Sequence, residues 1–312
     1  AGANVWTNVG DGTGDIEPFT FQGTQFGYMA GGNPTHDTIQ KYSFSADQDA
    51  TDVGNLPFTT AYTCGSTSVT HGYEGGTVSP AGHINKYSYA SDGDATKSGE
   101  LGVSQTDRVG SSSNGSYGFW HGSGSPYSAP AGDAITKTTW ASDGDSVDTG
   151  GDLSATRFAV GGHSSATHGY SSGGDTISGA KIDVIEKYAF SISTGTASDV
   201  GNLTGTKRDQ DCQSSTDYGY AGAATGGSAP ATRIDRFAFA SDGDSTDWGT
   251  LGITVHHPTG NSSTTHGYTG GSGHEPYLNH IQKIAFASAG TAADIGDLTI
   301  TTGYGGTTGS NY

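Results

Sequence analysis

The stretch "HIQKIAFAS", residues 280–288, places its side chains alternately on two sides of an extended chain. Ile281 and Lys283 fall on one side, and Gln282 and Ile284 fall on the other. A period of two residues, with isoleucine and phenylalanine among the members, is typical of a β-strand. This short stretch therefore predicts a strand.

The same stretch recurs along the chain, each time as an isoleucine followed two residues later by lysine or arginine. Successive isoleucines are 45, 51, 50, 49 and 47 residues apart, an aromatic residue follows each by five positions, and a Gly-x-Leu ends 17 or 18 positions after it. Six copies with this spacing establish an internal repeat, and the repeat decides the fold. The isoleucines are Ile39, Ile84, Ile135, Ile185, Ile234 and Ile281.

Each repeat predicts four short strands. A Gly/Tyr strand such as "THGYTGG" is followed by the isoleucine strand, by a turn that reads "SDGD" in several copies, and by a strand such as "ATDVGNL". A polar strand of small residues, such as "CQSSTDYGY", leads into the next copy. Four strands in 45–50 residues indicate an all-β protein, a single β-propeller domain over residues 1–312.

The number of blades depends on how the two ends of the chain are used. Seven aromatic residues end a glycine-rich strand, the last of them Tyr312, and "GDIEPF" at 14–19 matches "GNLPF" at 54–58. We therefore predict seven blades, the last assembled from residues 299–312 and 1–13, which would close the ring and remove its sheet edges. The alternative is six blades, with terminal strands left to pair with another subunit.

Composition limits the partners of this protein. The formal net charge is −18, and only 14% of residues are charged. Binding to nucleic acid requires lysine and arginine to neutralise phosphates, so we expect no nucleic-acid partner, and no anionic membrane partner either. No apolar run is long enough to cross a bilayer, so we expect no membrane insertion. Because the chain begins at Ala1 and not at methionine, we expect a processed or partial product.

The repeats resemble those of kelch-type propellers. In "VGNLTGTKRDQDCQSSTDYGYAGA" and the following "IDRFAFASDGDSTD" the shared elements are a leucine, an Arg a few residues on in several copies, a Gly/Tyr strand and a downstream aromatic strand. The style of "SSTTHGYTGG" is similar to repeat proteins encoded by aquatic bacteriophages and in aquatic metagenomes near tail or fibre genes. This resemblance implies a propeller fold and a place on a virion or cell surface.

Candidate sites are few in the sequence. The "DGD" turns at 92–94, 143–145 and 242–244 could bind calcium, but two copies have no acid there, so we interpret them as hairpin turns. Asp11 and Asp15 in "GDGTGD" are the remaining calcium candidates. We expect no metal and no cofactor. Cys64 and Cys212 are interpreted as small strand residues facing across the ring.

Three histidines share one sequence context. His71, His168 and His266 each precede a Gly-Tyr pair, and Phe, Tyr or Ser fills the same slot in the other copies. A slot that accepts such different residues is interpreted as a packing position, not as a metal or proton site. The repeated lysine or arginine after isoleucine is likewise interpreted as a strand residue that pairs with a nearby acid.

The sequence favours a non-enzymatic structural or adhesion protein, a subunit of an extracellular or virion fibre that associates with copies of itself. Val5, Trp6, Val9, Tyr304 and Tyr312 mark the strands that could join subunits by strand addition. The alternatives are a carbohydrate-binding propeller and a glycan-active propeller enzyme. If cell-surface glycans are partners, we expect them to contact aromatic loops. The candidate residues in these loops, which could equally form subunit interfaces, are Trp120, Tyr127 and Tyr277. Sequons occur at Asn114, Asn202 and Asn261.

Overall fold

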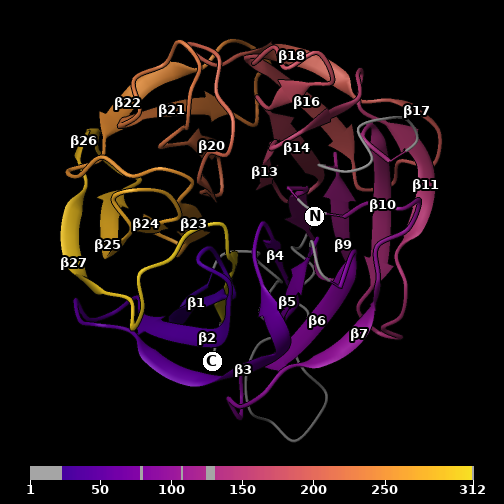
Figure 1. Ribbon diagram of the computed structural model, residues 1–312. Helices are drawn as coiled ribbons and strands as arrows, with labels where there is room; N and C mark the ends of the chain where they lie inside the picture. Colours follow the sequence, from indigo (N-terminus) through magenta and orange to yellow (C-terminus); the bar gives the residue numbers. More distant parts are fainter. Residues whose placement is uncertain (1–22, 78–79, 107, 124–130, 311–312) are drawn as a thin grey trace, which may run out of the picture.

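The computed structural model describes residues 23–77, 80–106, 108–123 and 131–310. In these residues there is no α-helix, and the strands form a ring of six four-stranded antiparallel units around a central axis (Figure 1). The all-β propeller predicted from the repeat is therefore confirmed. Each unit, here called a blade, has its first strand at the axis and its fourth at the rim.

Blades 1 to 6 are numbered from the N-terminal end of the described chain. Blade 1 consists of β28 (Gly306–Ser310), β1 (Phe26–Ala30), β2 (His36–Ser43) and β3 (Thr51–Thr60), and blade 2 of β4 (Cys64–Thr67), β5 (His71–Gly75), β6 (His83–Ser88) and β7 (Thr96–Glu100). Blade 3 consists of β8 (Gly110–Ser113), β9 (Tyr117–His121), β10 (Ala134–Thr139) and β11 (Val147–Asp152). Blade 4 consists of β13 (Gly161–Ser164), β14 (His168–Ser172), β16 (Val184–Ala189) and β18 (Ser198–Asn202).

The last two blades follow the same order. Blade 5 consists of β19 (Cys212–Ser214), β20 (Tyr218–Ala221), β21 (Arg233–Ala238) and β22 (Thr246–Thr250), and blade 6 of β23 (Thr259–Ser262), β24 (His266–Ser272), β25 (Leu278–Ala285) and β27 (Ala293–Asp297). Short strands complete the structure: β12 (Arg157–Phe158) pairs with β15 (Asp175–Thr176), β17 (Gly195–Thr196) with β11, and β26 (Gly290–Thr291) with β22.

The repeated apolar residues form the layers between blades. One core cluster joins Tyr28, Ile39 and Leu56 of blade 1 to Tyr87 and Tyr89 of blade 2. The other clusters combine residues of neighbouring blades in a similar manner, and all six repeat isoleucines are fully buried. The repeat residues of each blade are thus buried by contact with a neighbouring blade. An isolated blade would leave them exposed, so the repeat specifies stacked blades and not an isolated sheet.

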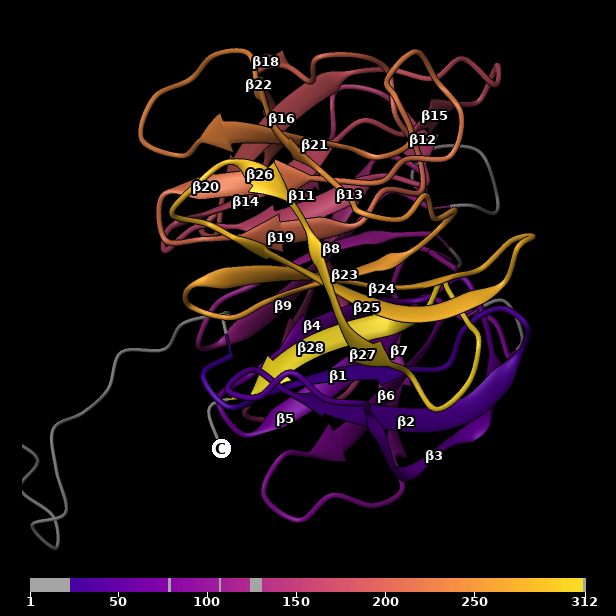
Figure 2. The same ribbon diagram turned by 90° about the vertical axis from the view of Figure 1, so that its left-hand side faces the viewer.

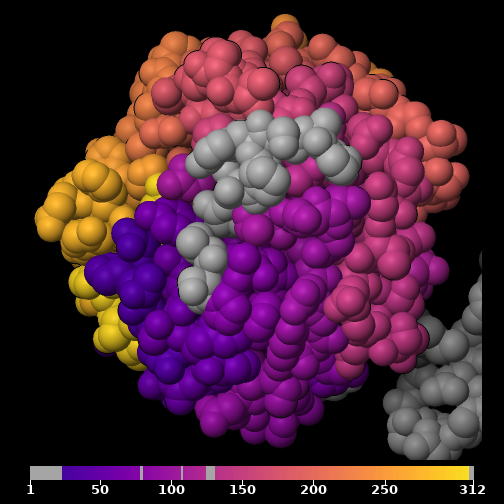
Figure 3. All heavy atoms as spheres, turned by 45° about the vertical axis from the view of Figure 1, so that its right-hand side comes forward, coloured from indigo at the N-terminus to yellow at the C-terminus, as the bar shows by residue number. Residues whose placement is uncertain are grey.

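The prediction of seven blades is wrong, and the ring has six. The C-terminal strand β28 pairs antiparallel with β1, so that Phe26 lies opposite Ser310 and Ala30 opposite Gly306. Figure 2 shows β28, in yellow, alongside the indigo β1, and Figure 3 shows the C-terminal part of the chain next to the N-terminal blade. The C-terminal strand does not begin a seventh blade: β28 corresponds to an innermost strand such as β4, and the strand that pairs with it as β5 pairs with β4 is β1.

Residues 299–310 therefore complete blade 1 and do not begin another blade. The proposed contribution of residues 1–13 to closure lies outside the described residues, as do Asp11, Asp15, Val5, Trp6, Val9 and Tyr312. Tyr304 precedes β28 and is not part of a strand.

Acidic turns fasten most blades to their neighbours. The repeated lysine of one blade forms an ion pair with the first acid of the turn in the next blade, as in Lys41 with Asp92 at 3.0 Å and Lys86 with Asp143 at 2.6 Å. The second acid of the turn accepts a backbone N–H from the outer strand of the preceding blade, as Asp94 does from Asn55 at 2.9 Å. Lys187–Asp242 and Lys283–Asp47 repeat the ion pair.

The two turns that lack acids use the backbone instead. In blades 4 and 6 the turn residues form β17 and β26, which pair in parallel with the outer strands β11 and β22 of the preceding blades. The "DGD" turns thus serve contacts between blades, in agreement with their interpretation as turns. In blade 5 Arg236 lies over the rings of Trp248 and Tyr218, at 3.6 Å and 4.3 Å from their centroids.

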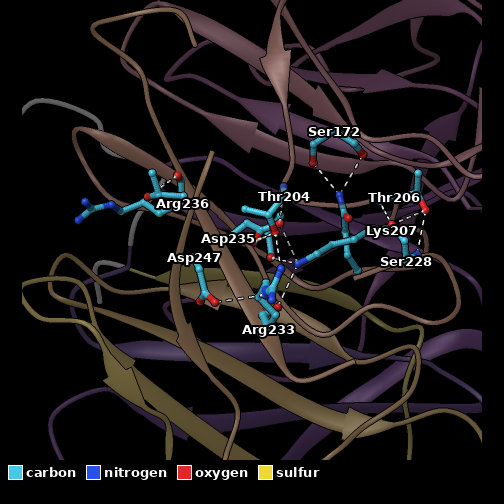
Figure 4. A network of polar contacts seen from close by, with 12 residues as sticks. Ser172, Thr204, Thr206, Lys207, Ser228, Arg233, Asp235, Arg236 and Asp247 are labelled. Atoms are coloured by element: carbon cyan, nitrogen blue, oxygen red, sulfur yellow. Dashed lines mark hydrogen bonds and ion pairs between the residues drawn. The ribbon is translucent and has the colours of Figure 1, made fainter. Parts of the chain in front are cut away.

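Buried ion pairs fix the connections that enter blades 4 and 5. Lys207 and Asp235 have no exposed side-chain surface, and Lys207 Nζ lies 3.3 Å from Asp235 Oδ2. The Lys207 ammonium also donates to the carbonyls of Ala221 and Arg233, and Asp235 accepts from Thr204 (Figure 4). Arg157 and Glu186 form the equivalent buried pair in blade 4.

Candidate binding site at the mouth of the central channel

The innermost strands of all six blades surround a channel along the axis. Its volume is about 170 Å³, and it is lined by backbone groups, by small side chains and by larger polar and aromatic residues such as His163, Gln213 and Tyr304. One position of each inner strand faces the channel: Ser111, Cys212 and Thr307 in blades 3, 5 and 1, and Gly65, Gly162 and Gly260 in blades 2, 4 and 6. The channel is therefore polar and narrow.

The three glycines are required by close approach of neighbouring strands. A Cβ on Gly65 would lie 2.0 Å from the carbonyl oxygen of Thr307 and 2.4 Å from its amide nitrogen. Gly162 and Gly260 meet the backbones of Ser111 and Cys212 in the same way. On the other side, the Ser111 and Thr307 hydroxyls donate to the carbonyls of Gly65 and Gly260. Glycine and a residue with a side chain thus alternate around the ring, which allows the six inner strands to pack closely.

One mouth of the channel is formed by six equivalent residues with left-handed backbone conformation. Each residue lies shortly before the inner strand of its blade and has a φ angle between +47° and +63°. Non-glycine residues adopt this conformation at a cost on the order of 1 kcal/mol. The six residues, called the mouth ring, are Tyr304, Tyr62, Arg108, Ala159, Asp209 and His257 of blades 1 to 6.

Backbone hydrogen bonds run around the mouth ring. The amide of Arg108 donates to the carbonyl of Tyr62 at 2.9 Å, and Ala159 and Asp209 donate to the carbonyls of Arg108 and Ala159 at 3.0 Å. The amide of Tyr304 donates to the carbonyl of His257 at 3.0 Å. These bonds hold the left-handed conformation and fix where the six side chains begin.

The aromatic members of the mouth ring contact one another. Tyr304 stacks on His257 with ring centroids 4.1 Å apart, and Tyr62 lies 4.5 Å from Tyr304. The Arg108 guanidinium lies over the Tyr62 ring at 4.7 Å. Both tyrosines and Arg108 are partly exposed. Burial is the main reason that the pKa of Tyr304 is raised, so its hydroxyl is protonated and can donate.

Asp209 is the acceptor of the mouth ring. Its side chain is only 3% exposed and lines the channel. Asp209 Oδ2 lies 3.2 Å from His257 Nδ1 and 3.6 Å from Arg208 Nε, which are ion-pair distances. Neither contact has hydrogen-bond geometry, and Oδ2 has no hydrogen-bond partner within the part of the chain that the structure describes. Burial is the main reason that the pKa of His257 is lowered, and the negative charge of Asp209 opposes this shift.

No sequence pattern marks the mouth ring, because its members share a backbone conformation and not a residue type. Left-handed positions are usually filled by glycine or asparagine, yet none of the six is either. Five of the six carry aromatic or charged side chains, which a structural turn does not need. Unexpected φ angles of this kind point to function when they cluster, as they do here.

The aromatic residues singled out from the sequence lie in different places. Trp120 does not belong to a loop: it is fully buried in β9, packs against Gly75 and donates from Nε1 to Thr138 at 3.0 Å. Tyr277 is partly exposed and immediately precedes β25. Tyr127 lies outside the described residues. Tyr304 belongs to the mouth ring, so its surroundings are those of a channel mouth and not of a free strand.

The repeated histidines lie at the opposite end of the inner strands from the mouth ring. Each follows the hairpin after an inner strand, and its Nδ1 is hydrogen-bonded to the preceding threonine, as in His71 with Thr70 at 2.7 Å. His168 and His266 repeat this bond at 2.8 Å. Burial lowers the pKa of all three, so they are neutral packing residues at neutral pH, as the variability of the slot indicated.

The two cysteines are not equivalent. Strand pairing places Cys64 opposite Gly75 and Cys212 opposite Ala221, which puts the cysteines one position apart along their inner strands. Cys64 packs with the core of blades 2 and 3, whereas Cys212 occupies the channel-facing position. Both are free, and burial raises the pKa of both thiols. Of the sequons, Asn202 is exposed, Asn114 is partly exposed and Asn261 is buried.

The residues that the structure describes contain no group of three or more His, Cys, Asp or Glu side chains arranged to hold a metal ion. They also contain no helix of the length and apolarity needed to cross a membrane.

Buried histidines predict that stability depends on pH. Burial lowers the pKa of His121 to about 3 and that of His163 to about 4, from 6.5. Between pH 6.5 and 4 the unfolded chain therefore binds more protons, and the free energy of unfolding falls as the pH is lowered. Replacing His163 with glutamine should reduce this loss by about 2 kcal/mol between pH 7 and pH 5, measured by urea unfolding.

Glu74 is the control, because its contribution to the free energy of unfolding changes with pH in the opposite direction. Burial raises its pKa to about 7 from 4.5, so between pH 7 and 4.5 the folded state binds more protons, and this contribution to stability grows as the pH falls. Glu74→Gln should therefore steepen the acid loss that His163→Gln reduces. Equal pH slopes in both variants and the unmodified protein would show that these groups do not titrate as described.

No family model matches the chain, and the comparison with curated proteins finds no match.

Proposed function

We propose that this protein is a non-enzymatic adhesion and structural module of an extracellular or virion surface, and that it adheres through the mouth ring. The observation that carries the proposal is the set of six equivalent left-handed residues, five of which present aromatic or charged side chains at one mouth of the channel. Tyrosine provides a large contact area with little loss of side-chain entropy, which suits a binding surface.

The rest of the molecule supports this role as a rigid carrier. The ring is closed by β28, adjacent blades are joined by ion pairs or parallel bridges, and the mouth ring is held by backbone hydrogen bonds. A preformed site of this kind loses little conformational entropy when a ligand binds. A net charge of −18 favours solubility in an external aqueous medium. The similarity of the repeat style to proteins that aquatic bacteriophages encode near tail or fibre genes is our reason for including a virion among the proposed locations.

We also propose that the protein is a subunit of a fibre. Copies of this chain on a fibre would multiply weak contacts by avidity. Because β28 is already paired within blade 1, its use in strand addition would open the ring, so the route to assembly that we propose leaves β28 in place.

The proposal is tested by measuring how much fluorescently labelled protein adheres to a panel of intact bacterial and algal cells. Tyr62→Ala and Tyr304→Ala should each reduce bound protein at least tenfold on the cells that the unmodified protein binds. Alanine already occupies the equivalent left-handed position at Ala159, so both variants are expected to fold.

Val69→Ser is the matched control. Val69 is 41% exposed and follows β4 at the end opposite Tyr62, so it belongs to the other mouth. It should leave adhesion unchanged. Loss of adhesion in Val69→Ser alone would show that the binding surface lies at the opposite mouth of the channel and would contradict the mouth ring as the binding site. If the unmodified protein adheres to none of the cells, the proposed function is contradicted.

A further inference from the structure

The mouth ring combines two kinds of chemistry within one small area. Tyr62 and Tyr304 supply partly exposed aromatic rings, and Arg108 supplies a guanidinium above Tyr62. Asp209 supplies a buried carboxylate oxygen without a hydrogen-bond partner in the described chain. A ligand that fits must therefore offer an apolar face to the rings, and both hydrogen-bond donors and acceptors at its edge.

The channel below the mouth ring further limits the chemical class of ligand that can bind. Its wall is made of peptide groups and of side chains such as Ser111 and Thr307, with glycine at three of the six channel-facing positions. Val109, Val160 and Pro258 also line it, but among the described residues its exposed surface is more polar than apolar, which disfavours a hydrophobic side chain or an acyl chain as the group that enters it. With about 170 Å³ it has room for several ordered waters or for a small polar group of a ligand.

The charges at the mouth also argue for an uncharged ligand group. Among the described residues, Arg108 and Arg208 bring positive charge and Asp209 and Asp175 bring negative charge, and Asp175 Oδ2 lies 2.7 Å from a terminal nitrogen of Arg208. A strongly anionic or cationic ligand would gain from one member of this set and be repelled by another. Hydroxyl groups can accept from a guanidinium and donate to a carboxylate at the same time.

We infer that the mouth ring binds a saccharide, with a sugar ring against Tyr62 and Tyr304 and a sugar hydroxyl directed into the channel to donate to Asp209. This inference rests on the proposed function and adds its ligand class. Pyranose rings have an apolar face and a hydroxyl-bearing edge, which is the combination that the mouth ring and channel require. Asp209 is then the residue that selects for a hydroxyl donor, since Oδ2 gains its missing partner only from such a ligand.

The test is an array of neutral, N-acetylated and acidic oligosaccharides, probed with the unmodified protein, Tyr304→Ala, Asp209→Asn and Val69→Ser. The unmodified protein and Val69→Ser should bind the same neutral or N-acetylated saccharides. Tyr304→Ala should lower the signal at least tenfold. Asp209→Asn retains the size of the side chain and one acceptor oxygen, and should lower binding about five- to tenfold while the melting temperature stays close to that of the unmodified protein.

The outcomes separate this inference from the proposed function. If the unmodified protein adheres to cells but binds no saccharide on the array, and if free glycine or glutamate at millimolar concentration blocks adhesion, the ligand is a peptide or amino acid and the inference is overturned. Binding restricted to acidic saccharides would overturn the choice of an uncharged group. Saccharide binding that is equal in Tyr304→Ala, Asp209→Asn and the unmodified protein would overturn the placement at the mouth ring.

Discussion

Replacing Lys207 with methionine is expected to lower the free energy of unfolding by about 3–5 kcal/mol, because it leaves the Asp235 carboxylate buried without a counter-charge. Both side chains have no exposed surface, and Lys207 Nζ lies 3.3 Å from Asp235 Oδ2. Burial is the main influence on the Lys207 pKa and lowers it, and the charge of Asp235 opposes this shift. Equilibrium unfolding in urea measures the effect.

The matched control is Lys187→Met. Lys187 forms an ion pair with Asp242, but the side chains are 23% and 55% exposed. An exposed pair contributes about 0–1 kcal/mol, so this variant should be nearly as stable as the unmodified protein. Adding Asp235→Asn to Lys207→Met should restore part of the lost stability, because no uncompensated charge then remains. Similar small losses in Lys207→Met and Lys187→Met would contradict the role of the buried pair.

Replacing Gly65 with alanine is expected to lower the free energy of unfolding by about 2–3 kcal/mol, because a Cβ there cannot fit against the closing strand. The added atom would lie 2.0 Å from the Thr307 carbonyl oxygen, and the atoms that it meets belong to backbone and not to a flexible side chain. Blade 2 and β28 must therefore separate, which weakens the closure of the ring. Thermal and urea unfolding report the loss.

Gly290→Ala is the control for this substitution. Gly290 lies in β26, where an added Cβ would meet nothing within 4 Å. Alanine there should change stability by less than about 0.5 kcal/mol. If Gly65→Ala is as stable as Gly290→Ala, then β28 does not pack against blade 2 as closely as described.

The repeat was enough to predict the blades but not their number. Ile39, Leu56 and their equivalents recur with a spacing that only four-stranded units explain, and they form the layers between blades. The number of blades depends on the pairing of β28 with β1, a contact between residues about 280 positions apart that leaves no periodic signal. In the sequence Tyr312 ends a glycine-rich stretch, as the marker residues do, so spacing alone does not show that β28 is an innermost strand.

Single-copy residues carry the candidate site, and the sequence therefore could not show it. Tyr62, Arg108, Asp209 and His257 share a backbone conformation but no residue type, and they meet only after the ring has closed. The buried pair of Lys207 and Asp235 was missed for a related reason, since lysine is usually exposed and only the packing of blade 5 shows that both groups are buried. The repeated residues therefore form the layers between blades, and the residues that occur only once form the mouth ring.

Hydrogen exchange with and without the oligosaccharide that gives the strongest array signal tests the central claim most directly. We predict that bound saccharide slows amide exchange in peptides that contain Tyr62, Arg108, Asp209, His257 and Tyr304, and leaves the hairpins at 68–70, 165–167 and 263–265 unchanged. Slower exchange confined to those hairpins, or to the outer strands of the blades, would contradict a binding site at this mouth of the channel.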